Sequence, residues 1–274
     1  MSSSGTMAQV AGEDLVSSVA PARSGPSARR SDVALRLSPT VAVGVLGLGW
    51  LAIVGASFAG LMSVLAAGVT RPEIGYSLDQ LSMVTKFLLK FDVGGEQTVA
   101  AWFSSVLFLL CGLVLIHVAG LKRRFAEPYA LHWLFLGLIF FALSMDDTVA
   151  FHESLIDPMR ALFQVTGGIF LYAWVIPAIA GVLVVGAAYV GFVFHLEPRY
   201  RNPIILSGVV FLTGAVGFEM MEGAFAAFYA GHLVIYETAV HVEDTLEFAG
   251  VLLFLYTLLR YAQAYCREIT IELR

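Results

Sequence analysis

Three short segments of this sequence place acidic and histidine side chains inside otherwise apolar stretches. They are residues 144–153 (SMDDTVAFHE), 217–223 (GFEMMEG) and 241–250 (HVEDTLEFAG). Carboxylates combined with imidazoles suit zinc, iron or manganese, whereas carboxylates alone suit calcium, magnesium or manganese. The residue types therefore predict a bound divalent metal, with iron, zinc or manganese as the candidates.

The predicted metal ligands are four carboxylates and one imidazole drawn from all three segments. They are Asp147, His152, Glu219, Glu243 and Glu247. Five neighbouring side chains are predicted to orient these ligands or to carry protons. They are Asp146, Glu153, Glu222, His241 and Asp244. The pattern assigns no catalytic residue.

Helical spacing, at about 100° per residue, places the acids on shared helix faces more readily than the histidines. In the second and third segments the glutamates pair one turn apart on a helix. On an ideal helix, however, His152 projects away from Asp146, and His241 lies nearly opposite Glu243. Either histidine therefore reaches the acids only if its helix ends or distorts nearby.

The elements that carry these segments are predicted to be transmembrane helices. The chain is 58% hydrophobic and only 14% charged, with a mean hydropathy of +0.81. Its charge-free runs match the roughly 20 residues that a helix needs to cross the bilayer core. The predicted spans are Val41–Ala67, Thr98–Ala119, Tyr129–Phe151, Gly168–Phe194, Pro203–Ala226 and Tyr236–Tyr261. The last two carry acids, so four or five spans is the alternative.

The distribution of basic residues predicts the orientation of these spans, because Lys and Arg accumulate on the cytoplasmic side. Twelve lie in the termini and in alternate connections: Arg23, Arg29, Arg30, Arg36, Lys122, Arg123, Arg124, Arg199, Arg201, Arg260, Arg267 and Arg274. The opposite connections hold Arg71, Lys86, Lys90 and Arg160. Both termini are therefore predicted to be cytoplasmic, and the fold to be an all-α polytopic bundle of about six helices.

The remaining segments flank this bundle. Residues 1–38, rich in Ser, Ala, Pro and Arg, are predicted to be a disordered cytoplasmic tail, and 264–274 a second cytoplasmic tail. The transmembrane domain is predicted at 39–263. Within it, apolar residues recur at helical spacing in the connection 72–95, which is typical of an amphipathic helix on the outer surface. A loop packed on the bundle is the alternative.

The predicted topology places all three acidic segments at a similar depth in the outer part of the membrane. A charged carboxylate at mid-bilayer costs about 2.5–3.5 kcal/mol, so eight isolated acids would cost on the order of 10–20 kcal/mol. Arg160 is the only basic residue nearby. Bound metal, proton uptake or contact with water must compensate. The structural alternative is that each acidic segment is simply a helix end reaching the headgroups.

The same residues resemble a widespread group of uncharacterised bacterial multi-pass membrane proteins. Their pattern is approximately Asp-Glu-x4-His-Glu, a lone Glu, and Glu-Glu-x-x-Glu-x-x-Gly. The matching stretches begin at Asp146, Glu219 and Glu243, and the resemblance covers roughly residues 100–262. This chain departs from the pattern at Asp147 and Asp244, where shorter arms would tighten or shift a ligand. The resemblance implies a bacterial inner-membrane location and no particular activity.

The leading functional hypothesis is a metal-binding membrane protein, and an enzyme acting on a lipid-like or small substrate is one form of it. A proton- or cation-coupled transporter is the alternative, although the inner halves of the acidic spans lack acids. A partner subunit without catalysis is the third. No basic patch with interleaved aromatics supports nucleic-acid binding. The aromatic side chains Trp133, Trp174, Tyr172 and Tyr236 fit interfacial belts. The oligomeric state stays open.

Overall fold

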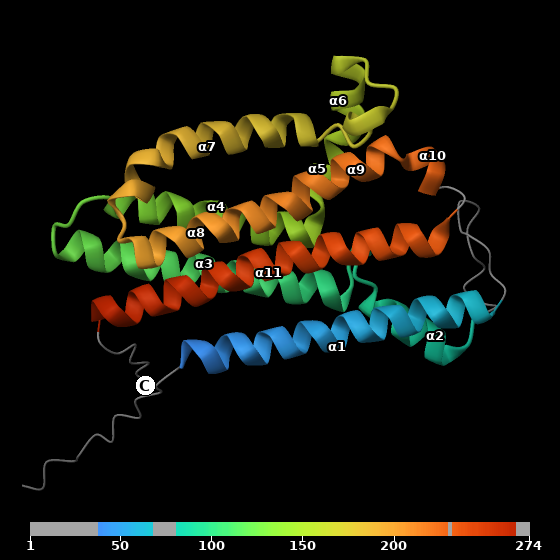
Figure 1. Cartoon of the computed structure of the whole chain (residues 1–274), viewed down its shortest axis with the longest axis horizontal. Helices are drawn as coiled ribbons and strands as arrows, with labels where there is room; N and C mark the ends of the chain where they lie inside the picture. Colours follow the sequence, from blue (N-terminus) through green and yellow to red (C-terminus); the bar gives the residue numbers. More distant parts are fainter. Residues whose placement is uncertain (1–37, 68–80, 230–231, 267–274) are drawn as a thin grey trace, which may run out of the picture. The chain divides into compact units, whose positions relative to one another are not determined.

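All regular structure in the described residues is helical. The computed structural model describes residues 38–67, 81–229 and 232–266 (Figure 1). The long helices are α1 (Pro39–Ala66), α3 (Val99–Arg124), α4 (Ala130–Val149), α7 (Val175–His195), α8 (Pro198–Leu212) and α11 (Leu233–Cys266). The π-helical segment η4 (Thr213–Phe218) and α9 (Glu219–Ala224) continue α8. The short connecting helices are α2 (Met83–Leu88), η2 (Leu89–Phe91), α5 (Phe151–Ser154), α6 (Ile156–Phe163), η3 (Gly168–Phe170) and α10 (Ala226–Tyr229).

Five of the helical segments are long and apolar enough to cross a membrane. They are α1, α3, α4, α7 and the continuous segment Pro198–Ala224. The prediction of an all-α chain with helices long and apolar enough to cross a membrane is confirmed, whereas the topology stays a prediction. The sixth predicted span corresponds to α11, whose 34 residues would extend about 50 Å, more than the bilayer core requires. Most of the predicted tails, residues 1–37 and 267–274, lies outside the described residues.

Among the predicted span boundaries that differ from the observed helices, two lie beside the acidic segments. The third span ends at Val149 rather than Phe151, because Ala150 adopts a left-handed conformation with φ of 54°. The fourth begins at Val175 rather than Gly168, because Gly168–Phe170 form a separate 3-10 turn. Both differences fall in short helical pieces beside the acidic segments.

Helices α3 and α4 pair closely through small residues. A Cβ atom added at Gly112 would lie 3.2 Å from the carbonyl oxygen of Gly137, so a side chain at this position would crowd the close approach of the two backbones. Further along the pair, the Ser105 hydroxyl donates to the Ser144 carbonyl oxygen at 2.7 Å, and the Ser144 hydroxyl donates to the Ser105 carbonyl oxygen at 2.9 Å. These contacts fix the acidic end of α4 against α3.

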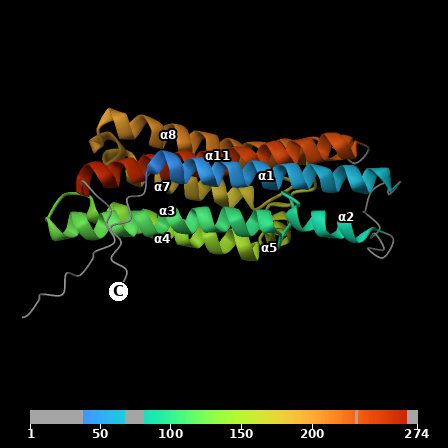
Figure 2. The same cartoon turned by 90° about the horizontal axis from the view of Figure 1, so that it is seen from below.

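Helix α11 is the central helix, packing against α1, α3, α8 and η4 (Figure 2). On one side, Trp50 of α1 stacks on Phe248 with ring centroids 4.4 Å apart. On the other side, a Cβ atom at Gly250 would lie 2.6 Å from the backbone nitrogen of Phe211. The glycine therefore allows α8 and α11 to cross in near-backbone contact, one turn from Glu247.

The connection between α1 and α3 is only partly helical. Its apolar residues Met83, Val84 and Phe87 are exposed on α2, whereas Leu81 and Val93 are buried. The short helix α2 packs against α1. An amphipathic helix was predicted in the connection 72–95; the described residues there form α2 and a 3-10 turn that begins at Leu89, and residues 72–80 lie outside the described residues. The location of this segment on the outer membrane surface stays a prediction.

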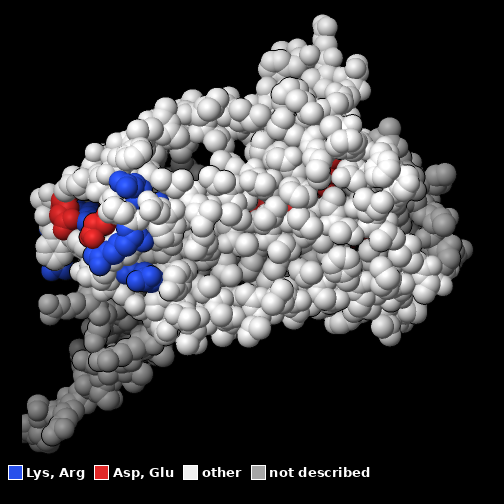
Figure 3. Space-filling view, in the orientation of Figure 1, with Lys and Arg blue, Asp and Glu red and all other residues white. Residues whose placement is uncertain are grey.

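Basic side chains gather at one end of the helix bundle, as Figure 3 shows for the face in view. This end holds the last turn of α3 with Lys122, Arg123 and Arg124. There Glu127 accepts hydrogen bonds from Lys122 and from the Tyr265 hydroxyl, and these bonds hold its pKa below the usual range. The acidic segments lie away from this end.

The close crossing at Gly250 gives a testable prediction. Replacing Gly250 with Ala should lower the free energy of unfolding by about 1–3 kcal/mol, because the methyl group must push α8 and α11 apart. The matched control is Gly208→Ala on α8, where a Cβ atom meets nothing within 4 Å. That variant should be neutral or gain about 0.5–1 kcal/mol from helix propensity. Unfolding of detergent-purified protein, followed by circular dichroism, measures both; equal stabilities would contradict the assigned crossing.

Candidate metal centre

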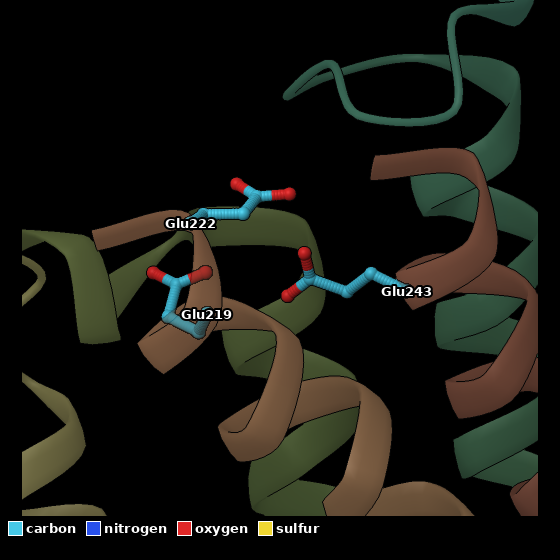
Figure 4. Close-up of side chains that lie close together, drawn as sticks. All are labelled: Glu219, Glu222 and Glu243. Atoms are coloured by element: carbon cyan, nitrogen blue, oxygen red, sulfur yellow. The ribbon is translucent and has the colours of Figure 1, made fainter. Parts of the chain in front are cut away.

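Three glutamates from two helices converge on one point. Glu219 and Glu222 project from α9 and Glu243 from α11, with their carboxylates directed toward one another (Figure 4). One oxygen from each lies within 4.8 Å of the others. Glu222 is 4% exposed and Glu243 9% exposed. Three carboxylate oxygens at this spacing could hold one metal ion.

The π-helical segment η4 directs α9 toward α11. Its six residues immediately precede Glu219, and π-helical turns of this kind often occur at functional sites. A Cβ atom at Gly214 would lie 2.8 Å from the carbonyl oxygen of Glu243 and 2.8 Å from Cγ of Glu247. A larger residue at position 214 would therefore separate the two helices that supply the glutamates.

The individual carboxylates have different partners. The indole nitrogen of Trp174 donates to Glu219 Oε1 at 2.8 Å. Glu222 Oε1 is buried with no hydrogen-bond partner. Both carboxylates lie within hydrogen-bonding reach of Glu243. An acceptor oxygen buried without a donor is destabilising, so this cluster calls for a cation or a proton.

The end of α4 brings His152 back to Asp146. Because Ala150 is left-handed, α5 turns away from the axis of α4 and the backbone N–H of His152 donates to Asp146 Oδ1 at 2.9 Å. The His152 Nδ1 atom lies 2.7 Å from Asp146 Oδ2. The helix distortion needed to bring this histidine toward the acids is therefore present. Glu153 is no longer on the same helix as Asp146, and its side chain is exposed.

His152 is oriented like a metal-binding imidazole. Asp146 engages Nδ1, which leaves Nε2 as the ring nitrogen that could bind an ion. The imidazole packs against the Trp174 ring with centroids 4.7 Å apart, and Trp174 in turn binds Glu219. Partial burial disfavours the imidazolium, but the hydrogen bond and charge of Asp146 outweigh it and raise the pKa of His152.

A second group of acids lies next to the three glutamates. Electrostatic repulsion couples Asp147 of α4 with Asp244 and Glu247 of α11. Asp147 Oδ2 is also buried without a hydrogen-bond partner. The predicted ligands Asp147, His152 and Glu247 are not part of the three-glutamate cluster in the described residues. Glu222, which was predicted as a neighbouring residue, is part of it. The ligand roles of Asp147, His152 and Glu247 stay predictions.

His241 belongs to a different polar contact. Its Nδ1 atom lies 2.6 Å from the Glu237 carbonyl oxygen, and its Nε2 atom lies 2.8 Å from the hydroxyl of Ser57. The same hydroxyl accepts from the backbone N–H of Val93 at 3.2 Å and lies 3.5 Å from Asp92. Burial raises the pKa of Asp92. His241 thus joins α11 to α1 and the segment after η2, with both ring nitrogens engaged.

Basic side chains do not neutralise the glutamates in the part of the chain that the structure describes. The ion pairs formed by Lys and Arg there are Lys122–Glu127, Arg160–Asp157 and Arg199–Glu197. Arg160 also donates to the Leu171 carbonyl oxygen at 2.6 Å. The one basic residue that sequence analysis placed near the acids is therefore engaged elsewhere.

Sequence reasoning missed the residues that position the site. Trp174 was assigned to an interfacial belt, yet it links Glu219 to His152. Ser57 and Asp92 carry no motif that sets them apart. Glu222 was recognised as an acid one turn from Glu219, but its inclusion among the converging carboxylates depends on η4, for which the sequence gives no signal.

The observations define a helical protein with segments long and apolar enough to cross a membrane and a largely buried carboxylate cluster that could hold a metal ion. The chain belongs to the family described as domain of unknown function (DUF8692), whose match covers residues 56–262. The match includes every residue of the candidate centre. The predicted resemblance to an uncharacterised family is confirmed at this level. No curated protein and no solved structure matches the chain.

The Asp146–His152 pair gives a second prediction. Because the pKa of His152 is raised, the pair stabilises the metal-free fold fully below about pH 6.5, its ordinary value, and this contribution is lost as pH rises through the folded-state pKa. Asp146→Asn should lower the pKa of His152 and remove this pH dependence, because the hydrogen bond and the charge that raise this pKa are lost.

Histidine-labelled, metal-free protein followed by NMR measures that pKa directly. The matched control is Asp157→Asn, because Asp157 is exposed and pairs with Arg160. The control should leave the titration unchanged. An unaltered His152 titration in the Asp146 variant would show that the pair does not govern this imidazole.

Proposed function

We propose that this chain is a six-span membrane protein that binds a divalent metal ion through Glu219, Glu222 and Glu243. The proposal rests on one observation, the convergence of three largely buried carboxylates within 4.8 Å. In this topology both termini are cytoplasmic, because the basic residues gather at the end of the bundle away from the acids. The centre then lies toward the outer side of a bacterial inner membrane.

Charge neutralisation favours a metal-bound cluster over a metal-free cluster of three ionised carboxylates. Removing one partner from a buried charge pair typically costs about 3–5 kcal/mol, and here no Lys or Arg in the described residues pairs with the glutamates. A divalent ion would neutralise most of the local charge at once. It would also give the unpartnered Glu222 oxygen a ligand bond.

The donor set favours a transition metal. Carboxylates alone would suit calcium or magnesium, but the Asp146–His152 pair adds an imidazole held by a carboxylate, which is how many metal-binding histidines are oriented. Iron, zinc and manganese accept both donor types. Asp147, Asp244 and Glu247 would then orient ligands or carry protons.

An enzymatic role follows if the ion keeps an open position. A bound metal can lower the pKa of a water ligand to about 7 and so supply a nucleophile. The neighbouring acids could accept the proton that is released. The substrate in this case would be a lipid-like or small molecule that reaches the outer half of the membrane.

A proton- or cation-coupled transporter is the second candidate. The acids Asp147, Asp244 and Glu247 extend the glutamate cluster, as a relay would require. Beyond Glu247, however, the described part of α11 contains no further acid, and α4 contains none before Asp146. The relay therefore has no continuation toward the basic end. Ion flux in proteoliposomes that depends on Glu247 would favour this candidate over a metal centre.

Metal content tests the proposal. Protein purified in mild detergent should contain about one divalent ion per chain by elemental analysis. Glu219→Gln and Glu243→Gln should each lower occupancy at least tenfold, because an amide supplies no charge. Glu222→Gln and Glu247→Gln distinguish the observed glutamate cluster from the ligand set predicted from the sequence. If the observed cluster binds the ion, Glu222→Gln should lose the bound metal and Glu247→Gln should retain it.

The control is Glu197→Gln, which removes an exposed carboxylate paired with Arg199 at the far end of α8. It should bind metal like the unaltered protein. Metal that persists in both Glu219→Gln and Glu243→Gln, or that is absent from folded, unaltered protein supplied with iron, zinc and manganese, would rule out the proposed centre.

A further inference from the structure

An apolar groove of about 430 Å³ runs between α7 and the segment formed by α8 and η4. Its volume lies in the range of small-molecule binding pockets, about 300–1,000 Å³. Figure 3 shows the surface hollowed between α7 and the helices below it. The α7 wall consists of Ile179, Val182 and Leu183. The opposite wall consists of Val209, Leu212, Thr213, Val216 and Gly217.

The groove exists because α7 is held only near its ends. Val175 and Phe192 are its buried residues, and the side chains between them are partly or fully exposed. At one end Phe192 packs edge-to-face on Trp133, with ring centroids 4.9 Å apart. At the other end Trp174, which precedes α7, binds Glu219. The middle of α7 is therefore free to border a ligand.

One end of the groove lies near the hydrogen bond between Trp174 and Glu219. Gly217, at the end of its α8–η4 wall, is two residues before Glu219. On the other wall, Ile179 lies little more than one turn from Trp174. From Gly217 back to Val209, the groove extends about 12 Å at the rise of a helix. It is an open apolar groove, with the Trp174–Glu219 hydrogen bond beyond one end.

The aliphatic lining of the groove favours a hydrocarbon ligand. All lining side chains are aliphatic except Thr213, whose hydroxyl donates to the Val209 carbonyl oxygen at 2.8 Å. The groove therefore offers no free side-chain donor along its length. Both walls belong to segments long and apolar enough to cross a membrane, so lipid surrounds them in the proposed topology. A polar ligand would lose its hydrogen bonds on entry, whereas an alkyl chain would lose nothing.

We propose that this groove binds the hydrocarbon chain of a membrane amphiphile whose oxygen-bearing polar end lies at Glu219, Glu222 and Glu243. The inference rests on the proposed metal centre, because a metal ion there would attract an oxygen-bearing head group. It assigns the substrate class of that centre: a long-chain lipid that enters sideways from the bilayer between α7 and α8.

Photolabelling tests the groove directly. The probe is palmitic acid carrying a diazirine near the end of its chain, added to the full-length protein in phosphatidylcholine nanodiscs. Labelled peptides should map to the groove walls around Val182 and Val209. Val182→Trp should lower this labelling at least fivefold, because the indole fills the groove. The matched control is Val184→Trp, two residues further along α7, where the side chain points to the opposite side of the helix.

A second pair of variants approaches from the other wall. Gly217→Leu should lower labelling in the same way, and Gly208→Leu, where a Cβ atom meets nothing within 4 Å, should not. This pair decides the matter if Val182→Trp does not fold. Labelling that is unchanged in the groove-filling variants, or equal on all lipid-facing helices, overturns the proposal. So does a crosslink between two copies of the chain across this groove.

Metal content of the same samples separates this inference from the proposed function. Groove labelling that disappears in Val182→Trp while one metal per chain remains supports both. Labelling that is sensitive to Val182→Trp in protein without metal supports the hydrocarbon site and removes the metal centre. Full metal content with labelling insensitive to every variant removes the hydrocarbon site alone.

Discussion

Negative charge concentrated in a low-dielectric bundle is the constraint on which the rest of this structure depends. Glu219, Glu222 and Glu243 approach within 4.8 Å, and Asp147, Asp244 and Glu247 repel one another beside them. Water screens such charges poorly when they are buried. A fold that holds these acids together must therefore be rigid at this point, or the helices would separate. The close contacts around α11 supply that rigidity.

Glycine and the π-helical segment allow the acids to meet. Gly214 and Gly250 bring α8 and η4 against the backbone of α11 on either side of Glu247. Because a π-helical turn changes the angular position of all later residues, η4 decides which face of α9 carries Glu219 and Glu222. The same segment forms part of the groove wall, since Thr213, Val216 and Gly217 of η4 line the groove. Segment η4 therefore contributes to both the cluster and the groove.

The sequence predicts the helices well because bilayer thickness is a strong constraint on charge-free length. It predicts the acidic segments for the same reason, since buried charges interrupt those runs. It does not predict the left-handed Ala150, because alanine has no preference for that conformation, and so the position of His152 could only be stated conditionally. The sequence did not reveal the hydrogen bond between Trp174 and Glu219, and it left the position of His241 open. The partners of both side chains come from distant segments, which helical periodicity cannot identify.

Helix α7 links the two chemical environments of the molecule. At one end its aromatic contacts through Phe192 join it to α4 near the basic end of the bundle, and at the other end Trp174 bridges His152 and Glu219. A rigid helix held at two points can border a ligand without collapsing onto α8. A hydrocarbon in the groove would lie little more than one helical turn from Trp174, the residue that holds Glu219 by a hydrogen bond, so the groove and the carboxylates share helix α7 as a neighbouring element.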